Sequence, residues 1–304
     1  MTNKRALLID GGSGRIFCSV PAIKEYIKRY PDTIILSSGT EVLGTLDFIP
    51  RLYSPVTPYL FKDILQPRRF IHPEPYHDYN YYQGKSHLIQ SYYKVLGLKP
   101  PKELPKINLK FTDIEIEQAK EILNKHKKVQ GKDKVLIIQP FGASAIIKHD
   151  KIFDPTNRSI EHDFYVKLRE QASKFYTILE MRNLYLPNEQ NIMGNELPLR
   201  AWLVLLSLAD AFIGIDSIGQ HVTYAYDVPS LIFIGSTNKT NICYENHRII
   251  QRNGYPKTYH PFRLPDTIGN DILYNIDALK FTDNEQKDII TEVTTWLNAI
   301  SLKF

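Results

Sequence analysis

The 304-residue sequence has little of what builds disulfide frameworks, metal knuckles or membrane spans. It contains only two cysteines, Cys18 and Cys243, and no Cys-x-x-Cys pair, so neither a disulfide-stapled fold nor a zinc site is indicated. No run of about 18 apolar residues is present, and a membrane-spanning helix would need one. The first ten residues enter a strand-like run at once, without the apolar core and cleavage site of a signal peptide. We therefore expect a cytoplasmic protein without membrane insertion.

The chain also lacks a strong charge of either sign. Its 38 basic and 33 acidic residues leave a formal net charge of +5, which suits a polyanionic partner without requiring one. Apolar residues make up 43% and charged residues 23%, as in ordinary globular proteins. At this length the chain can form one large domain or two medium domains with ample core.

The N-terminal pattern is that of a strand–loop–helix–strand unit. Residues 5–10 form an apolar run that ends in a Gly-Gly-Ser-Gly loop, a helical pattern covers residues 17–30, and residues 33–36 form a second apolar run. This order predicts a doubly wound parallel sheet. The loop matches neither the dinucleotide fingerprint nor the P-loop. Gly12 and Gly14 therefore either make a tight turn or bring the backbone close to a ligand phosphate.

The middle of the chain differs from both ends. Residues 54–106 are rich in proline and tyrosine, and the Lys-Pro-Pro-Lys-Glu-Leu-Pro run at residues 99–105 predicts a linker. Beyond it the α/β rhythm restarts, with Thr112 and Glu115 at the spacing of a helix capping box. We expect an N-terminal domain of residues 1–105 and a C-terminal domain of residues 106–304. The helical pattern at residues 289–302 is one that could pack back on the N-terminal domain.

Three predicted strand ends in the second half carry small or polar residues. The carboxyl ends of parallel strands are where α/β sheets bind ligands. A carboxylate there can hold a ribose, and hydroxyl and helix-start N–H groups can hold a pyrophosphate. The alternative is that Asp216 and Ser217 cap a helix and that His221 is a packed core residue. The residues at these ends are Gly142 and Ser144, then Asp216, Ser217 and His221, and finally Ser236 and Thr237.

Several blocks resemble glycosyltransferase family 9, the ADP-heptose lipopolysaccharide heptosyltransferases. The resemblance extends over most of the chain and is strongest in the late block. The blocks are a strand and small-residue loop leading to Pro21-Ala22, the Pro-Phe-Gly-Ala-Ser turn at 140–144, Arg158 ahead of Phe164 and Tyr165, and Asp-Ser-Ile-Gly-Gln-His at 216–221 followed by Val228-Pro229 and Gly-Ser-Thr at 235–237.

The resemblance implies a GT-B fold, an α/β architecture of two Rossmann-like domains facing a cleft. It implies an enzyme whose donor is a nucleotide sugar of the UDP or ADP type, bound by the C-terminal domain, with no other cofactor. Arg158 would meet the diphosphate, residues 216–221 would seat the donor, and Ser236 and Thr237 would line the same site. No metal is expected, because helix ends and basic side chains can offset the charge of the leaving diphosphate.

One position departs from the family pattern. Heptosyltransferases carry an Asp, thought to be the catalytic base, directly after the glycine of the first loop, where this chain has Arg15. Arginine cannot accept a proton, so we group Arg15 with the donor-binding residues. The base is then expected elsewhere in the N-terminal domain, at Asp78, Glu74 or Asp10. The alternative is that residues 72–78 only pack between the domains.

The proline-rich segment also suggests the acceptor. Arg68, Arg69, Tyr76 and His77 combine cations with stacking surfaces, a mixture that suits an extruded base or a single strand. Loops of this style are similar to family 9-like proteins of large bacteriophages. The first hypothesis is thus glycosylation of a 5-hydroxymethylpyrimidine in phage DNA, in the host cytoplasm. The second is a lipopolysaccharide-core or other surface-glycan transferase with a phosphorylated acceptor. The third is a non-catalytic module that binds nucleotide sugar or nucleic acid.

Overall fold

Two compact α/β units make up the chain. The computed structural model describes residues 4–44, 48, 51–182, 184–187, 189, 197–257 and 277–301. The division lies between Met1–Phe111 and Thr112–Phe304, and thus a few residues beyond the predicted boundary at 105/106. The α/β class predicted from the strand–loop–helix–strand pattern is confirmed.

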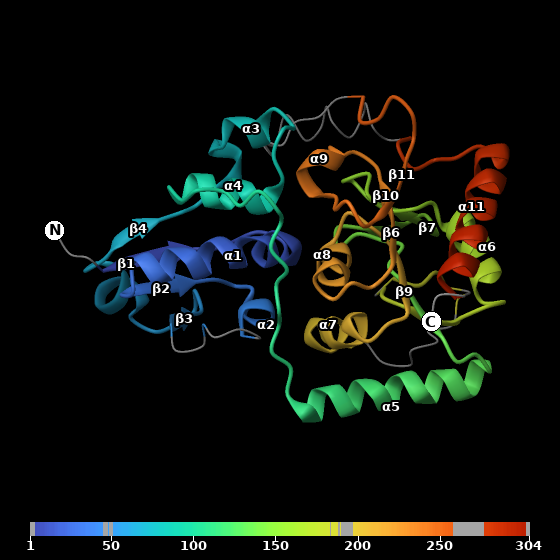
Figure 1. Ribbon diagram of the computed structural model, residues 1–304, viewed down its shortest axis with the longest axis horizontal. Helices are drawn as coiled ribbons and strands as arrows, with labels where there is room; N and C mark the ends of the chain where they lie inside the picture. Colours follow the sequence, from blue (N-terminus) through green and yellow to red (C-terminus); the bar gives the residue numbers. More distant parts are fainter. Residues whose placement is uncertain are drawn as a thin grey trace. The chain divides into compact units, whose positions relative to one another are not determined.

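The first unit is built on a four-stranded parallel sheet in the order β3-β2-β1-β4 (Figure 1). Ala6 and Leu7 of β1 are fully buried, and α1 packs a face of apolar residues that includes Phe17 and Ile23. The described elements of this unit are β1 (Arg5–Leu8), α1 (Ser13–Arg29), β2 (Thr33–Leu36), α2 (Thr40–Leu43), β3 (Leu52–Tyr53), η2 (Leu60–Leu65), β4 (Arg69–Ile71), η3 (Pro75–His77), α3 (Tyr79–Tyr82) and α4 (Leu88–Val95).

The proline-rich segment contributes to this sheet. β4 pairs with β1 in parallel, and the Arg69 N–H donates to the Lys4 carbonyl. The sequence did not indicate this strand, because β4 has only three residues. It also lies at the edge of the sheet, where flanking prolines are tolerated and a strand needs no long apolar run. Its position decides where the residues that follow it lie.

The second unit has a five-stranded parallel sheet in the order β11-β10-β9-β5-β8. Every residue of β5, β9 and β10 is buried, as expected for strands covered by helices on both faces. The described elements are α5 (Asp113–Gln130), β5 (Val135–Ile138), β6 (Ile146–Lys148), β7 (Lys151–Phe153), α6 (His162–Ala172), β8 (Thr177–Glu180), α7 (Leu199–Ser207), β9 (Ala211–Ile215), α8 (Ile218–Ala225), β10 (Ser230–Ile234), α9 (Lys239–Ile242), β11 (Arg248–Gln251) and α11 (Asp283–Ser301).

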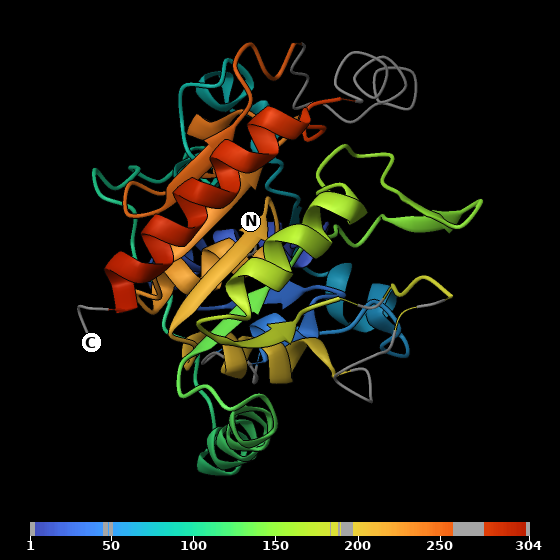
Figure 2. The same ribbon diagram turned by 90° about the vertical axis from the view of Figure 1, so that its right-hand side faces the viewer.

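The terminal helix α11 belongs to the core of this second unit. Ile289, Val293 and Leu297 pack in one apolar cluster with residues of α6 and the sheet. Figure 2 shows α11 beside α6 on one face of the sheet, and their contacts agree with this view. α11 thus packs within its own unit, and additional packing on the first unit stays a prediction. None of the described helices is long and apolar enough to cross a membrane.

Candidate functional site

The three polar strand ends predicted in the second unit lie at one edge of its sheet. β5, β9 and β10 are neighbouring parallel strands, so the turns that follow them meet at the carboxyl edge. The segment of residues 154–159, which follows β7, joins all three turns. We call this segment the bridging loop. Its first residue, Asp154, was not identified from the sequence.

Asp154 anchors the bridging loop. Its carboxylate accepts hydrogen bonds from Ser159 Oγ at 2.6 Å, from Thr156 N at 2.8 Å and from Thr156 Oγ1 at 2.6 Å. Ser144 Oγ, in the turn after β5, donates to it at 3.4 Å. Burial raises the pKa of this carboxyl, but the bonds from Ser159 and Thr156 outweigh burial, and the pKa lies below its usual value. Asp154 is therefore held ionised and fully bonded.

Close packing fixes the bridging loop against the other turns. A Cβ on Gly142 would lie 2.9 Å from Asp154 Oδ2, and a Cβ on Gly235 would lie 2.1 Å from the Asn157 carbonyl oxygen. Ser236 Oγ donates to the Thr156 carbonyl at 2.7 Å. A side chain at residue 142 would meet the bonded Asp154 carboxylate, and one at residue 235 would meet the backbone of Asn157, so glycine fits best at both positions. The loop and the two turns form one preorganised unit.

Arg158 supplies the positive charge at this edge. Its Nε donates to Thr156 Oγ1 at 3.0 Å, and one terminal nitrogen lies 3.5 Å from the Asp216 carbonyl. These contacts aim a half-buried guanidinium between the bridging loop and the turn after β9. A planar guanidinium held in this way is suited to a phosphate group.

The turn after β9 is tied to the turn after β10. Asp216 accepts from Thr237 Oγ1 at 2.6 Å and from Gln220 Nε2 at 3.2 Å. Ser217 caps α8 by accepting from the Gly219 N–H at 3.3 Å. Asp216 and Thr237 therefore tie the two turns together, whereas Ser217 bonds Gln139 and the start of α8, in agreement with the helix-cap alternative for Ser217.

His221 lies inside the protein, not at the exposed edge. It is 3% exposed, and its Nδ1 lies 2.8 Å from the Tyr244 hydroxyl. Burial, and to a lesser extent nearby His247, lowers the pKa of His221 to about 3. Tyr244 in turn stacks on Tyr224 at a centroid distance of 3.8 Å. This environment fits the packed-histidine alternative better than direct contact with a donor.

A buried ion group follows the neighbouring strand β8 and was also missed from the sequence. Glu180, the last residue of β8, is 1% exposed and lies 3.4 Å from Arg182. Arg182 also makes two 3.0 Å contacts with Glu189. Burial raises the pKa of Glu180, and Arg182 opposes that rise. The sequence carries a signal for this residue, because Glu180 directly follows the apolar Ile178 and Leu179 and ends β8 at the same edge.

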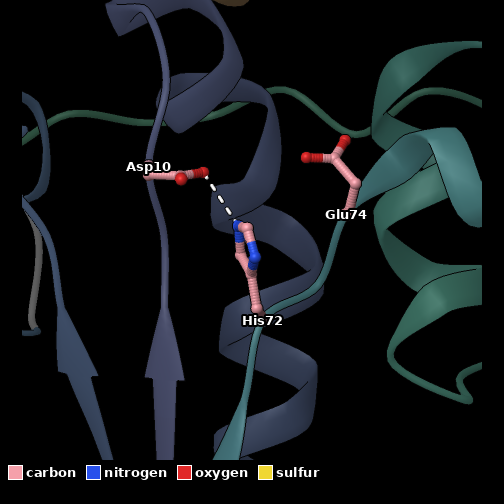
Figure 3. Close-up of side chains that lie close together, drawn as sticks. All are labelled: Asp10, His72 and Glu74. Atoms are coloured by element: carbon pink, nitrogen blue, oxygen red, sulfur yellow. Dashed lines mark hydrogen bonds and ion pairs between the residues drawn. The ribbon is translucent and has the colours of Figure 1, made fainter. Parts of the chain in front are cut away.

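The first unit brings a different set of residues to the carboxyl edge of its sheet (Figure 3). Asp10 follows β1, and His72 and Glu74 follow the adjacent parallel strand β4. His72 Nε2 lies 3.1 Å from Asp10 Oδ1. The Asp10 side chain is 48% exposed and that of His72 38%. This pair is accessible to water and was not foreseen, because β4 was not predicted.

Arg15 is paired with Glu74 within the same unit. One of its terminal nitrogens lies 3.0 and 2.9 Å from the two Glu74 oxygens and 4.0 Å from Asp10 Oδ1. Burial lowers the pKa of Arg15, but contacts with Tyr92 and Glu74 reverse this and raise it above its usual value. Its side chain folds over Gly11, where the φ of 93° favours glycine. Gly12 has open space for a Cβ and is the N-cap of α1, whereas Gly14 lies in the first turn of that helix.

Two of the three predicted bases are occupied by structural bonds. The buried Asp78 accepts from Ser91 Oγ at 2.6 Å, Ser86 Oγ at 3.0 Å and Asn80 N at 3.2 Å, which makes it the cap of α3. Glu74 is clamped by Arg15. Asp10 remains the most accessible of the three carboxylates.

The four predicted acceptor residues differ in exposure: Arg69 and His77 are exposed, and Arg68 and Tyr76 are half-buried. Arg68 donates to the Ile64 carbonyl at 2.7 Å and is thereby tied to its own turn, whereas Arg69 is exposed on β4. His77 is exposed, and the Tyr76 ring lies 5.3 Å from the Arg15 guanidinium carbon. Exposed aromatic rings nearby in the chain include Tyr79, which is 71% exposed.

Asp10, His72 and Glu74 also have the spacing of metal ligands, since one atom from each lies within 4.8 Å of the others. The Arg15 guanidinium already supplies the positive charge that this set would attract, and it occupies both Glu74 oxygens. A divalent ion bound here would have to displace that contact or lie beside a fixed positive charge. The arrangement therefore favours an ion-paired carboxylate beside a histidine–aspartate pair.

Comparisons with known proteins show the fold. No family model and no curated protein matches the sequence. Glycosyl transferase family 9 from Veillonella parvula is similar over 98% of each chain, with a TM-score of 0.60 at 12% identity. ADP-heptose LPS heptosyltransferase II of E. coli is similar over 97% of this chain and 99% of that chain, with a TM-score of 0.58 at 12% identity.

A third structure is the iron-containing dodecameric glycosyltransferase TibC from enterotoxigenic E. coli, similar over 100% of this chain and 76% of that chain, with a TM-score of 0.57 at 14% identity. The order of elements in the two units thus matches structures of this class over nearly the whole chain. This chain has the GT-B fold of the family 9 glycosyltransferases.

Proposed function

We propose that this protein is a glycosyltransferase that moves a sugar from a nucleotide-sugar donor to a hydroxyl acceptor, with the donor's diphosphate at the bridging loop. The observation that carries the proposal is the meeting of three polar turns at the carboxyl edge of β5, β9 and β10. Such an edge is where α/β sheets bind their ligands. The fold similarity to glycosyltransferases supports the same conclusion independently.

The chemistry of the turns suits a leaving diphosphate. Transfer builds negative charge on the diphosphate as the bond to the sugar breaks, and preorganised donors stabilise that charge without rearranging. Arg158 offers a guanidinium held by Thr156 and by the Asp216 carbonyl. The start of α8 adds its helix-terminal N–H groups at the same edge. These groups are fixed before the ligand binds, because Asp154 holds the loop that carries Arg158.

An adenine nucleotide is the first donor to test. The E. coli structure that is similar over almost the whole chain is named an ADP-heptose heptosyltransferase. A uridine nucleotide is the next choice, since the bridging loop is proposed to hold the diphosphate, which both nucleotides share. We therefore propose a donor with a diphosphate, and the transfer assay identifies its base and sugar.

Two acceptors are proposed. A phosphorylated surface glycan comes first, since the E. coli structure is named a lipopolysaccharide heptosyltransferase. Hydroxymethylated DNA is the second, favoured by the exposed Arg69 and His77 and by the 71%-exposed Tyr79 in the first unit. Exposed rings beside cations can stack on bases and pair with phosphates.

The test is a transfer screen with a matched pair of variants. Wild-type protein is incubated with ADP- and UDP-sugars and either a phosphorylated core glycan or hydroxymethylated DNA, and products are read by mass spectrometry. Arg158→Lys replaces the planar fork with a point charge. It should weaken nucleotide binding about tenfold, which corresponds to about 1.4 kcal/mol by calorimetry. Arg29→Lys, at the exposed end of α1, is the control and should bind as the parent does.

The outcomes separate the alternatives. Sugar on the glycan or on the DNA identifies the acceptor. Nucleotide binding without transfer to any acceptor would indicate a non-catalytic binding module. Absence of nucleotide binding in the folded wild-type protein would contradict the proposed function altogether.

A further inference from the structure

We propose that His72 is the general base of this transferase and that Asp10 is the positioning residue that orients its ring. This inference rests on the proposed function and names the group that takes the acceptor's proton. It follows from the contact between His72 Nε2 and Asp10 Oδ1 at 3.1 Å, at the carboxyl edge of β1 and β4 (Figure 3).

The contact fixes which ring nitrogen can act. An ionised carboxylate can only accept hydrogen bonds, so the nitrogen facing Asp10 carries the proton. In a neutral imidazole the other nitrogen, Nδ1, then has a free lone pair. No described residue hydrogen-bonds to this Nδ1, and the His72 side chain is 38% exposed. The pair thus presents an unoccupied proton acceptor toward solvent.

The other carboxylates near this edge cannot take this role as readily. Both Glu74 oxygens are held by Arg15 at 3.0 and 2.9 Å, and the Asp78 carboxylate is buried under three hydrogen bonds. Arg15 itself, at the position where an acceptor-side carboxylate was expected, cannot accept a proton. Of the three carboxylates of Asp10, Glu74 and Asp78, that of Asp10 is thus the accessible one, and it contacts His72.

The step balances without any further reagent. The acceptor hydroxyl oxygen forms a bond to the anomeric carbon of the sugar while the bond from that carbon to the diphosphate oxygen breaks. The nucleoside diphosphate leaves with the electron pair, and the hydroxyl proton moves to His72 Nδ1. The Asp10 carboxylate, 3.1 Å from Nε2, stabilises the imidazolium that results. Because the ring is partly exposed, the proton can then pass to water.

Two substitutions test the roles separately. His72→Gln removes the base and should lower kcat by about 10²- to 10⁴-fold with the acceptor KM and donor affinity little changed. It should also abolish the fall in rate on the acid side of the pH profile. Asp10→Asn should lower kcat because the ring loses its orientation, but the acid-side fall should remain.

Matched controls are His149→Gln, at an exposed turn between β6 and β7, and Asp32→Asn, at an exposed turn before β2. Both controls should retain the parent rate.

A second measurement does not depend on turnover. Nitrogen-15 NMR of the histidine rings, with the His72 signal assigned from its loss in His72→Gln, should show the tautomer protonated at Nε2. Asp10→Asn should convert it to a mixture of tautomers. A His72 ring protonated at Nδ1, or one unchanged by Asp10→Asn, would contradict the pairing even if the protein proved not to be a transferase.

Three results would overturn the assignment. Full activity in His72→Gln would remove the histidine from the reaction. An acid-side fall that persists in His72→Gln but vanishes in Asp10→Asn would make Asp10 itself the base. Loss of activity on chelation, restored by magnesium or manganese, would make Asp10, His72 and Glu74 a cation site instead. If the wild-type protein transfers no sugar, the proposed function and the base role fall together, and the tautomer measurement still decides the pairing.

Discussion

At the carboxyl edge of the second sheet, the Asp154 carboxylate bonds both Thr156 and Ser159, and Thr156 in turn accepts from the half-buried Arg158 guanidinium. At the corresponding edge of the first sheet, Asp10 and His72 form a contact that water can reach. The same parallel-strand geometry thus produces two chemically different edges. A site that must hold one ligand shape benefits from side chains that restrain each other. A site that must exchange a proton benefits from an accessible, unfilled acceptor.

The largest effect that this comparison predicts comes from removing the anchor of the bridging loop. Asp154→Ala leaves the Ser159 and Thr156 donors without their acceptor and should lower the free energy of unfolding by about 3 kcal/mol. Nucleotide affinity should fall at least about tenfold, because Arg158 loses its support. Chemical denaturation and calorimetry measure the two quantities. Asp133→Ala, in an exposed turn before β5, should change neither. If the free energy of unfolding of Asp154→Ala equals that of the parent, other contacts hold the loop.

The next effect concerns the close approach of two backbones. In Gly235→Ala the new Cβ would lie 2.1 Å from the Asn157 carbonyl oxygen, so one backbone must move. We expect a loss of roughly 2 kcal/mol in the free energy of unfolding, as for other overpacked sites. Thermal and denaturant unfolding of the variant measure this loss. A crystal structure of the variant with both turns unmoved would contradict the explanation.

A smaller effect tests the buried histidines of the second unit. Burial lowers the pKa of His247 to about 4, and both of its ring nitrogens lack hydrogen-bond partners among the described residues. In the unfolded chain His247 binds a proton below about pH 6.5, whereas in the folded protein it does so only below about pH 4. The free energy of unfolding therefore decreases as the pH falls from about 6.5 to about 4. His247→Phe keeps the ring contacts with Tyr244 and Tyr224. The free energy of unfolding of His247→Phe, compared with the parent, should be higher at pH 5 than at pH 7.5 by about 1–2 kcal/mol.

Urea denaturation at the two pH values measures this difference. His149→Phe, at an exposed turn, is the control and should leave the pH dependence as it is in the parent. An identical pH dependence in His247→Phe would mean that His247 is not the group responsible.

The smallest effect is expected in the first unit. A Cβ at Gly12 meets nothing within 4 Å, so Gly12→Ala should cost less than about 1 kcal/mol in the free energy of unfolding, mainly through a poorer helix N-cap. Chemical denaturation of Gly12→Ala and Gly235→Ala compares the loss in free energy of unfolding at the two sheet edges. If nucleotide affinity nevertheless falls tenfold in a stable Gly12→Ala protein, a ligand approaches this backbone, and the first unit takes part in donor binding.

The elements of the second unit could be predicted from the sequence because their signals are local. The capping box of Thr112 and Glu115 forms as its spacing indicates, with Thr112 Oγ1 accepting from the Glu115 N–H at 3.3 Å. β9 ends at Ile215, directly before Asp216, as expected from the predicted strand end. Buried apolar runs followed by small or polar residues suffice to locate a sheet edge in a parallel fold.

The contacts within each site could not be predicted in the same way. Asp154 reaches Ser144 only because the chain returns through β6 and β7, a short hairpin with exposed residues and no distinctive pattern. His72 reaches Asp10 because β4 pairs with β1, and a three-residue edge strand leaves almost no sequence signal. The assignments of Asp78 and His221 rested on residue type and position along the chain, which do not reveal that both side chains are buried among structural partners.

The paired contacts of Arg15 and Glu74 restrict how this position can change over evolutionary time. Arg15→Asp alone would leave Glu74 without its cation and place a new carboxylate near Glu74 and Asp10, so like charges would meet in a half-buried space. Glu74→Arg alone would set two guanidinium groups against each other. The two residues are therefore expected to be epistatic, with each single exchange more harmful than the double exchange. An aspartate at residue 15 is therefore expected to be tolerated better in a protein in which residue 74 has also changed.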